Sequence, residues 1–170
     1  MAAFLIRETT PEQSAQLSTE DLNRRRRSIS PTLPDDPATI AQLTDGERLI
    51  ADRNPRAAEA AFKNVLVKYP DQIRAWYGLG LVALLDHNGP RAKEVFGRLT
   101  AGEHAATKDP MVLAWSHVYL ARVLDEEGQL EQSKSEYQAA LAVQGAPAKA
   151  QQAAQKELGD LNLRKSAERP

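Results

Sequence analysis

Hydrophobic residues recur with a helical period from residue 39 onward, and this pattern predicts a series of amphipathic helices. In residues 39–52 the apolar positions are Ile40, Leu43, Leu49 and Ile50, which share one side of a helix. Groups of Asn, Asp, Gly and Pro interrupt the pattern at intervals, and several prolines fall where a new helix would begin. We therefore expect an all-α fold in which turns join the helices.

A repeat of 34 residues connects the first two helical pairs. Three packing positions recur at this spacing: Gly46 as Gly80, Ala58 as Ala92, and Phe62 as Phe96. The small residues would let two antiparallel helices approach closely, and the aromatic ring would fill the space between them. Self-similarity of this kind is typical of repeat architectures, in which each unit packs on the next.

A third unit follows at a displacement of 41 residues. Its residues pair with those of the second unit in this order: Leu120 with Leu79, Ala121 with Gly80, Gly128 with His87, Ser133 with Ala92, and Tyr137 with Phe96. The seven residues by which 41 exceeds 34 fall in 100–110, where they would lengthen the preceding helix or form a loop. Asp109 and Pro110 are expected to cap and begin the next helix.

The second unit has motif residues at a recognisable spacing: Trp76, Leu79, Gly80, Ala92 and Phe96, with Pro70 closing the unit before it. On these residues, 39–145 resembles three tetratricopeptide repeats, although the first unit has Gln42 at the position of Trp76. The resemblance implies a right-handed α-solenoid with units at 39–72, 73–106 with a loop extended to 110, and 111–145. A capping helix at 146–165 and a frayed tail at 166–170 would follow.

The first 38 residues differ from the rest, because prolines and Ser or Thr residues are frequent there. We expect a partly disordered extension or linker with a short helix at 11–27. The run Arg24–Arg27 has two interpretations. It is either a basic patch, for nucleic acid or for a kinase acting on Ser28, or a solvated helix end whose cations favour the C-terminal dipole.

The resemblance also implies a concave groove lined by the first helix of each unit. The partner-binding residues that it gives are Glu47, Arg74, Tyr77, Leu81, Trp115, Val118, Arg122 and Asp125. Tyr, Trp and Arg are common in binding hot spots. An alternative is that Leu81 and Val118 pack between helices and that Tyr77 and Trp115 belong to the core. The Lys and Asn positions of the family's carboxylate clamp are not filled by those residues here, so a mixed apolar groove for a peptide or helix is expected.

Catalytic chemistry is not suggested by the sequence. His87, His104 and His117 form no metal-binding pair at helical spacing, and the chain has no Cys. Gly78 and Gly80 fall inside a predicted helix without the strand and third glycine of a phosphate loop. We therefore expect no enzyme, cofactor or metal, and the net charge of −1 argues against nucleic acid as a partner.

Two functions remain open at this point. The first is a scaffold or adaptor module that binds a peptide or helix of another protein. The second is an accessory C-terminal repeat domain, without catalysis of its own, because residues 111–121 are similar to the repeat tails of bacterial cell-envelope proteins, some of them peptidase-like. No apolar run is long enough for a membrane span or a signal peptide, so a cytoplasmic location is expected, or a periplasmic one if the chain is a fragment.

Overall fold

The computed structural model describes residues 36–101 and 109–167, which belong to one compact unit spanning residues 32–170. The expected helix at 11–27, the Arg24–Arg27 run and His104 lie outside the described residues. Within them the chain forms helices and no strand. Their bounds are α2 (Pro37–Ala51), α3 (Pro55–Lys68), α4 (Ile73–Leu85), α5 (Gly89–Thr100), α7 (Pro110–Glu126), α8 (Leu130–Ala142) and α9 (Ala148–Ala167).

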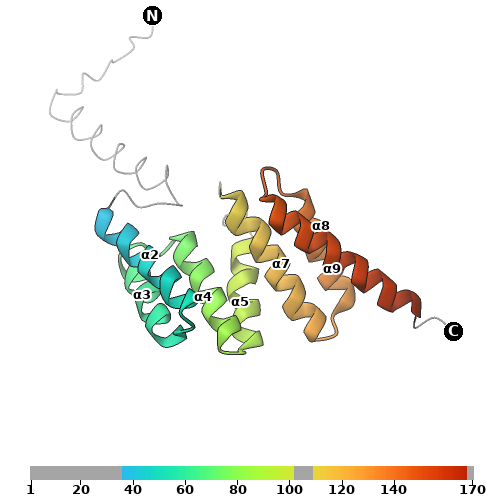
Figure 1. The fold of residues 1–170 in the computed structure, drawn as a ribbon, viewed down its shortest axis with the longest axis horizontal. Coiled ribbons are helices and arrows are strands. Elements are labelled where there is room, and N and C mark those ends of the chain that lie inside the picture. Colours follow the sequence, from blue (N-terminus) through green and yellow to red (C-terminus); the bar gives the residue numbers. More distant parts are fainter. Residues whose placement is uncertain (1–35, 102–108, 168–170) are drawn as a thin grey trace, which may run out of the picture. The chain divides into compact units, whose positions relative to one another are not determined.

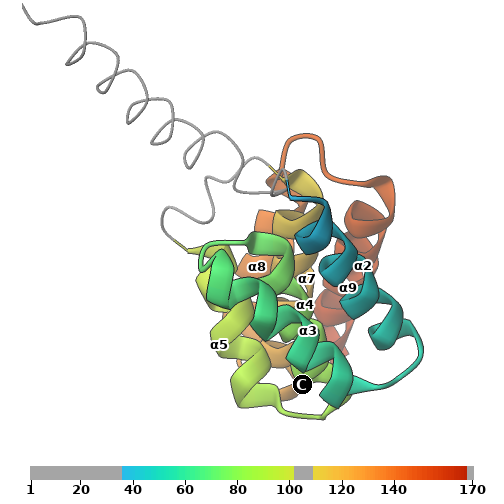
Figure 2. The same cartoon turned by 90° about the vertical axis from the view of Figure 1, so that its left-hand side faces the viewer.

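The helices pack as three consecutive helix–turn–helix units followed by α9. Within each unit the two helices contact each other, and each second helix also contacts the first helix of the next unit (Figure 1). The first helices α2, α4 and α7 contact one another in order, and α9 continues this series by packing on α7 and α8. Figure 2 views the array from the end that carries α2 and α3. The prediction of an all-α solenoid with a C-terminal helix is confirmed.

Equivalent turns connect the two helices of each unit. The residues Arg53, His87 and Gly128 occupy the same place in the three turns, and all have positive φ, of 53°, 52° and 75°. In the first two units Asn then caps the second helix: Asn54 Oδ1 accepts from the amide of residue 57, and Asn88 Oδ1 from that of residue 91. These side chains satisfy amides that would otherwise have no partner at the start of a helix.

Three glycines of the first helices lie directly against buried aromatic rings. A Cβ atom added at Gly46 would lie 2.7 Å from the Phe62 ring, and one added at Gly78 would lie 2.3 Å from the same ring. Gly80 has the same relation to Phe96, at 2.6 Å. Both rings are fully buried. Gly78 and Gly80 therefore lie within α4 as sites of close packing, one for the ring of the first unit and one for the ring of the second.

Trp76 packs between the first two units. Its ring packs against the buried residues of both units, and its indole Nε1 donates to the carbonyl oxygen of Pro70 at 2.7 Å. The guanidinium of Arg98 lies 4.1 Å from the centre of the Trp76 ring, which is a cation–π distance. Contacts with α5 and with the turn before α4 therefore fix the position of the Trp76 ring.

The third unit has a more polar core than the second. Ser116, Ser133 and Tyr137 are fully buried, and their hydroxyl oxygens make no hydrogen bond with the described residues. The second unit has apolar side chains at the three corresponding positions, which are Ala75, Ala92 and Phe96. A buried hydroxyl without a partner destabilises a fold by about 1–3 kcal/mol. These hydroxyls therefore lower the stability of the third unit, and the second unit has no such groups at the equivalent positions.

Candidate functional site

A pocket opens on the face that the first helices form. Its volume is about 430 Å³, and we call it the α2–α4–α7 pocket. It is lined by residues from α2, α4 and the start of α7, namely Glu47, Ile50, Arg74, Tyr77, Gly78, Leu81, Asp109 and Met111. Every one of these residues belongs to a first helix or to its N-cap, so three successive units contribute to one surface.

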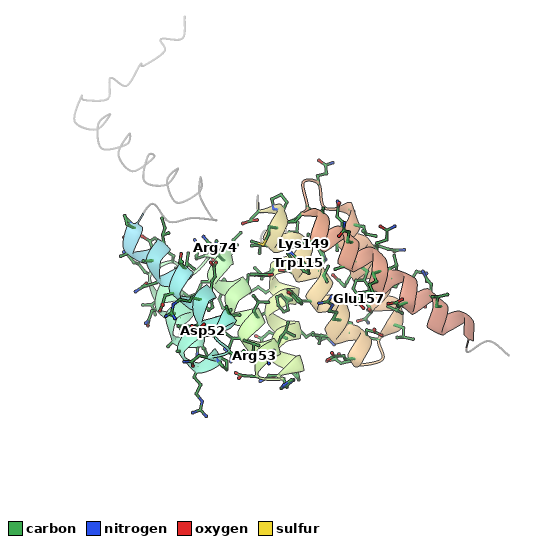
Figure 3. The ribbon with its side chains drawn as sticks, in the orientation of Figure 1. Asp52, Arg53, Arg74, Trp115, Lys149 and Glu157 are labelled. Atoms are coloured by element: carbon green, nitrogen blue, oxygen red, sulfur yellow. The ribbon has the colours of Figure 1, made fainter. Side chains whose placement is uncertain are left out.

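An ion pair between Glu47 and Arg74 connects α2 to α4 at the pocket. Both Nε and Nη2 of Arg74 donate to Oε1 of Glu47, with the Nε contact at 3.2 Å. The Arg74 side chain is only 21 % exposed, and Figure 3 shows it near the start of α4. Because two donors converge on one carboxylate, this guanidinium is held in a fixed position rather than extended into solvent.

Tyr77 lies between the pocket and the core. Its ring meets Phe96 edge-on at 6.2 Å and Tyr119 at 6.3 Å between ring centres. Burial raises the pKa of the Tyr77 phenol well above its usual range, and Tyr119 and the carboxylates of Asp109 and Glu47 raise it further. The hydroxyl therefore stays protonated and neutral near two carboxylates.

A second group of aromatic and charged residues lies farther along the same layer of helices. Trp115 stacks on Tyr119 at 5.5 Å, and the Arg122 guanidinium lies 5.6 Å from the Tyr119 ring centre. Arg122 also donates to Glu157 at 3.1 Å, which connects α7 to α9. Figure 3 shows Trp115 on α7 and Glu157 on α9. Stacking and ion pairing thus fix the face between the third unit and the C-terminal helix.

The structure brings half of the expected groove residues together. Glu47, Arg74, Tyr77 and Leu81 all line the α2–α4–α7 pocket, whereas Trp115, Arg122 and the half-buried Asp125 lie outside it. Val118 is fully buried, because it packs in the core shared by α7, α8 and α9. The expectation that Val118 lines a binding surface is therefore corrected: it is a core residue.

Asp109 and Met111 line the pocket but are not among the partner-binding residues expected from the sequence. The sequence indicates Asp109 only as a helix cap and Met111 only as the first residue of the third unit. Both belong to an N-terminal turn of α7 that extends beyond the repeat: α7 begins at Pro110, whereas the residue that corresponds to the start of α4 is Ala114. The Asp109–Pro110 cap signal, together with the displacement of 41, could have indicated this extra turn.

His117 lies on α7 at the position that corresponds to Trp76, outside the pocket lining. Its side chain is largely buried, and Nδ1 lies 2.7 Å from Oε2 of Glu136 on α8. Glu136 also borders a second hollow, of about 500 Å³, between α5, α7 and α8. Among the described residues, no group of three or more His, Cys, Asp and Glu residues is arranged to hold a metal ion.

Comparison with known proteins adds no functional assignment. No protein-family model matches the chain, and no curated protein matches it. None of the helices in residues 36–101 and 109–167 is both long and apolar enough to cross a membrane.

Proposed function

We propose that this chain is a protein–protein interaction module of the tetratricopeptide-repeat type, which binds a peptide or helix of a partner in the α2–α4–α7 pocket. The observation that carries the proposal is the origin of the pocket walls, which come from the first helices of three successive units. A segment seated there would contact all three units at once. The role requires no catalytic residue and no cofactor.

The chemistry of the pocket supports a partner with apolar side chains. Ile50, Leu81 and Met111 supply apolar wall, and Met111 is 37 % exposed. The charged residues Glu47 and Arg74 neutralise each other, so they shape the rim without adding a net field. Apolar contact framed by polar groups is the usual composition of a helix-binding or peptide-binding groove.

The proposal is tested by partner capture with two matched variants. Met111→Lys places a long cation inside the pocket. Val67→Lys makes the same kind of change on α3, where Val67 is 85 % exposed and does not line the pocket. The full chain and both variants are cross-linked in extracts of the source cell, and recovered proteins are quantified. We expect Met111→Lys to lower recovery of specific partners at least tenfold and Val67→Lys to leave it unchanged.

The control for this experiment is thermal unfolding. Both positions are exposed, and surface substitutions usually change the free energy of unfolding by less than about 0.5 kcal/mol. Equal recovery by both variants and the unchanged chain would contradict the proposed site.

A further inference from the structure

The extra turn at the start of α7 gives the α2–α4–α7 pocket a wall that the other units do not have. Met111 corresponds, 41 residues earlier, to Pro70, which lies in the turn between α3 and α4. A wall of this kind is therefore specific to the third unit. It contributes two side chains to the pocket, an apolar one from Met111 and a carboxylate from Asp109.

Among the described residues that line the pocket, the carboxylate of Asp109 is not paired with a cationic side chain. Arg74 is paired with Glu47 through two donors. Asp109 accepts hydrogen bonds from the amides of Met111 at 3.0 Å and Val112 at 3.2 Å, and both end on Oδ1. Among the described residues Oδ2 takes part in no hydrogen bond or ion pair. Glu47, Arg74 and Asp109, the charged residues among the described lining, thus sum to a net negative charge.

The walls and this carboxylate together fit one kind of side chain. Leu81 and Met111 offer apolar surface, and the pocket volume of about 430 Å³ is ample for a long side chain. Lysine and arginine place an apolar stem along apolar surface while the cationic head reaches a polar group. Tyr77 lines the same pocket as Asp109, and the oxygen of its neutral phenol is able to accept a hydrogen bond there.

We infer that the α2–α4–α7 pocket binds a lysine or arginine side chain of a partner segment, with the stem against Leu81 and Met111 and the head at Asp109. Apolar residues flank this cation in the partner and contact Ile50 and the exposed part of Met111. The inference rests on the proposed function, since it specifies what the same pocket selects. Complementarity of charge sets specificity here, while apolar contact supplies most of the affinity.

The experiment uses a phage-displayed library of random peptides, selected on the immobilised full chain. We expect the enriched sequences to share a Lys or Arg next to Leu, Ile or Phe. A synthetic peptide of the enriched sequence is then compared with the same peptide carrying Gln in place of the cation. The Gln peptide should bind about tenfold more weakly, which corresponds to about 1.4 kcal/mol.

Asp109→Asn is the decisive variant, because Asn caps a helix as well as Asp does but carries no charge. In this variant the difference between the cationic and Gln peptides should fall to less than about twofold. Glu94→Gln is the matched control: it removes an exposed carboxylate on α5 outside the pocket and should keep the tenfold difference. Asp109→Ser offers a second uncharged cap if Asp109→Asn lowers the melting temperature.

The possible results separate this inference from the proposed function. Enrichment of peptides without a cation, or of acidic peptides that pair with Arg74, would overturn the inference and leave the binding module standing. An unchanged tenfold difference in Asp109→Asn and Asp109→Ser would do the same. If no peptide is enriched over a surface without protein, both the inference and the proposed function are overturned.

Discussion

The contact between Gly78 and the Phe62 ring should make the substitution Gly78→Ala destabilising, although alanine normally strengthens a helix. The added Cβ would lie between 2.3 and 2.6 Å from three ring carbons of Phe62. Carbon atoms prefer separations of about 3.5–4.0 Å, so the ring would have to move by roughly an ångström. Gly46 also lies against this ring, and a Cβ added there would be 2.7 Å from it.

The magnitude follows from two opposing contributions. Alanine in a helix interior is favoured over glycine by about 1 kcal/mol. Overpacking a dense core costs about 1–3 kcal/mol, and the fully buried Phe62 ring places this case at the upper end. We expect a net loss of about 1–2 kcal/mol in the free energy of unfolding, or roughly 2–8 °C in melting temperature.

The matched control is Gly97→Ala in α5, the helix that pairs with α4. A Cβ atom at Gly97 would meet nothing within 4 Å, so the helix preference acts alone and we expect a gain of about 0.5–1 kcal/mol. Denaturant unfolding followed by circular dichroism measures both variants. In Gly78→Ala combined with Phe62→Leu, the loss should be smaller than the sum of the two single losses, because the leucine lacks the ring carbons that clash. Stabilisation by Gly78→Ala equal to that of Gly97→Ala, or strict additivity of the double variant, would refute the packing argument.

Three further predictions concern the third unit and the turns. Ser116→Ala and Ser133→Ala should each raise the free energy of unfolding by about 0.5–1 kcal/mol in urea titrations, because each removes a buried hydroxyl without a partner. His87→Gly should raise the free energy of unfolding by about 0.5 kcal/mol, because the relief of a left-handed conformation exceeds the entropy cost of glycine. Gly128→Ala should lower it by about 1 kcal/mol, because alanine is strained at this positive φ. Melting temperatures test both. Burial, with the charge of Glu157 adding to it, raises the pKa of Tyr137 to about 12 in the folded state. The unfolded chain therefore releases this proton first, near a pKa of about 10, and the free energy of unfolding should fall as the pH rises above that value. In Tyr137→Phe this fall should be smaller. Unfolding titrations below and above that pH measure both.

Much of the scaffold could be predicted from the sequence because its residues repeat. The spacing between Phe62 and Phe96 predicted equivalent packing positions, and the glycines Gly46 and Gly80 lie against those rings. The role of Gly78 could not be found in this way. It accepts a ring from the preceding unit, and a pattern within one unit does not indicate which neighbour fills a gap between units.

The face proposed to bind a partner was harder to predict. The repeat register gives the direction of a side chain on an isolated unit, but it does not show which side chains the next unit covers. Val118 has the register of a surface residue, yet α9 and α8 bury it. Arg74 and Arg122 have the register of exposed cations, yet each is paired with a carboxylate of the adjacent first helix or C-terminal helix. These differences arise from contacts between units, which a single helix pattern does not contain.

The part of the pocket that the sequence left unassigned is also the part that distinguishes this array from a uniform one. A residue's role in one unit is predicted from the equivalent residue of another unit. The equivalents of Asp109 and Met111 lie outside α4, so the comparison predicts no role for them. Uniform units would offer a similar surface at each step along the array. The additional turn of α7 instead places one apolar wall and one carboxylate at a single position. Under the proposed function, selectivity for a partner therefore belongs to the residues that break the repeat, while affinity and stability depend on those that keep it.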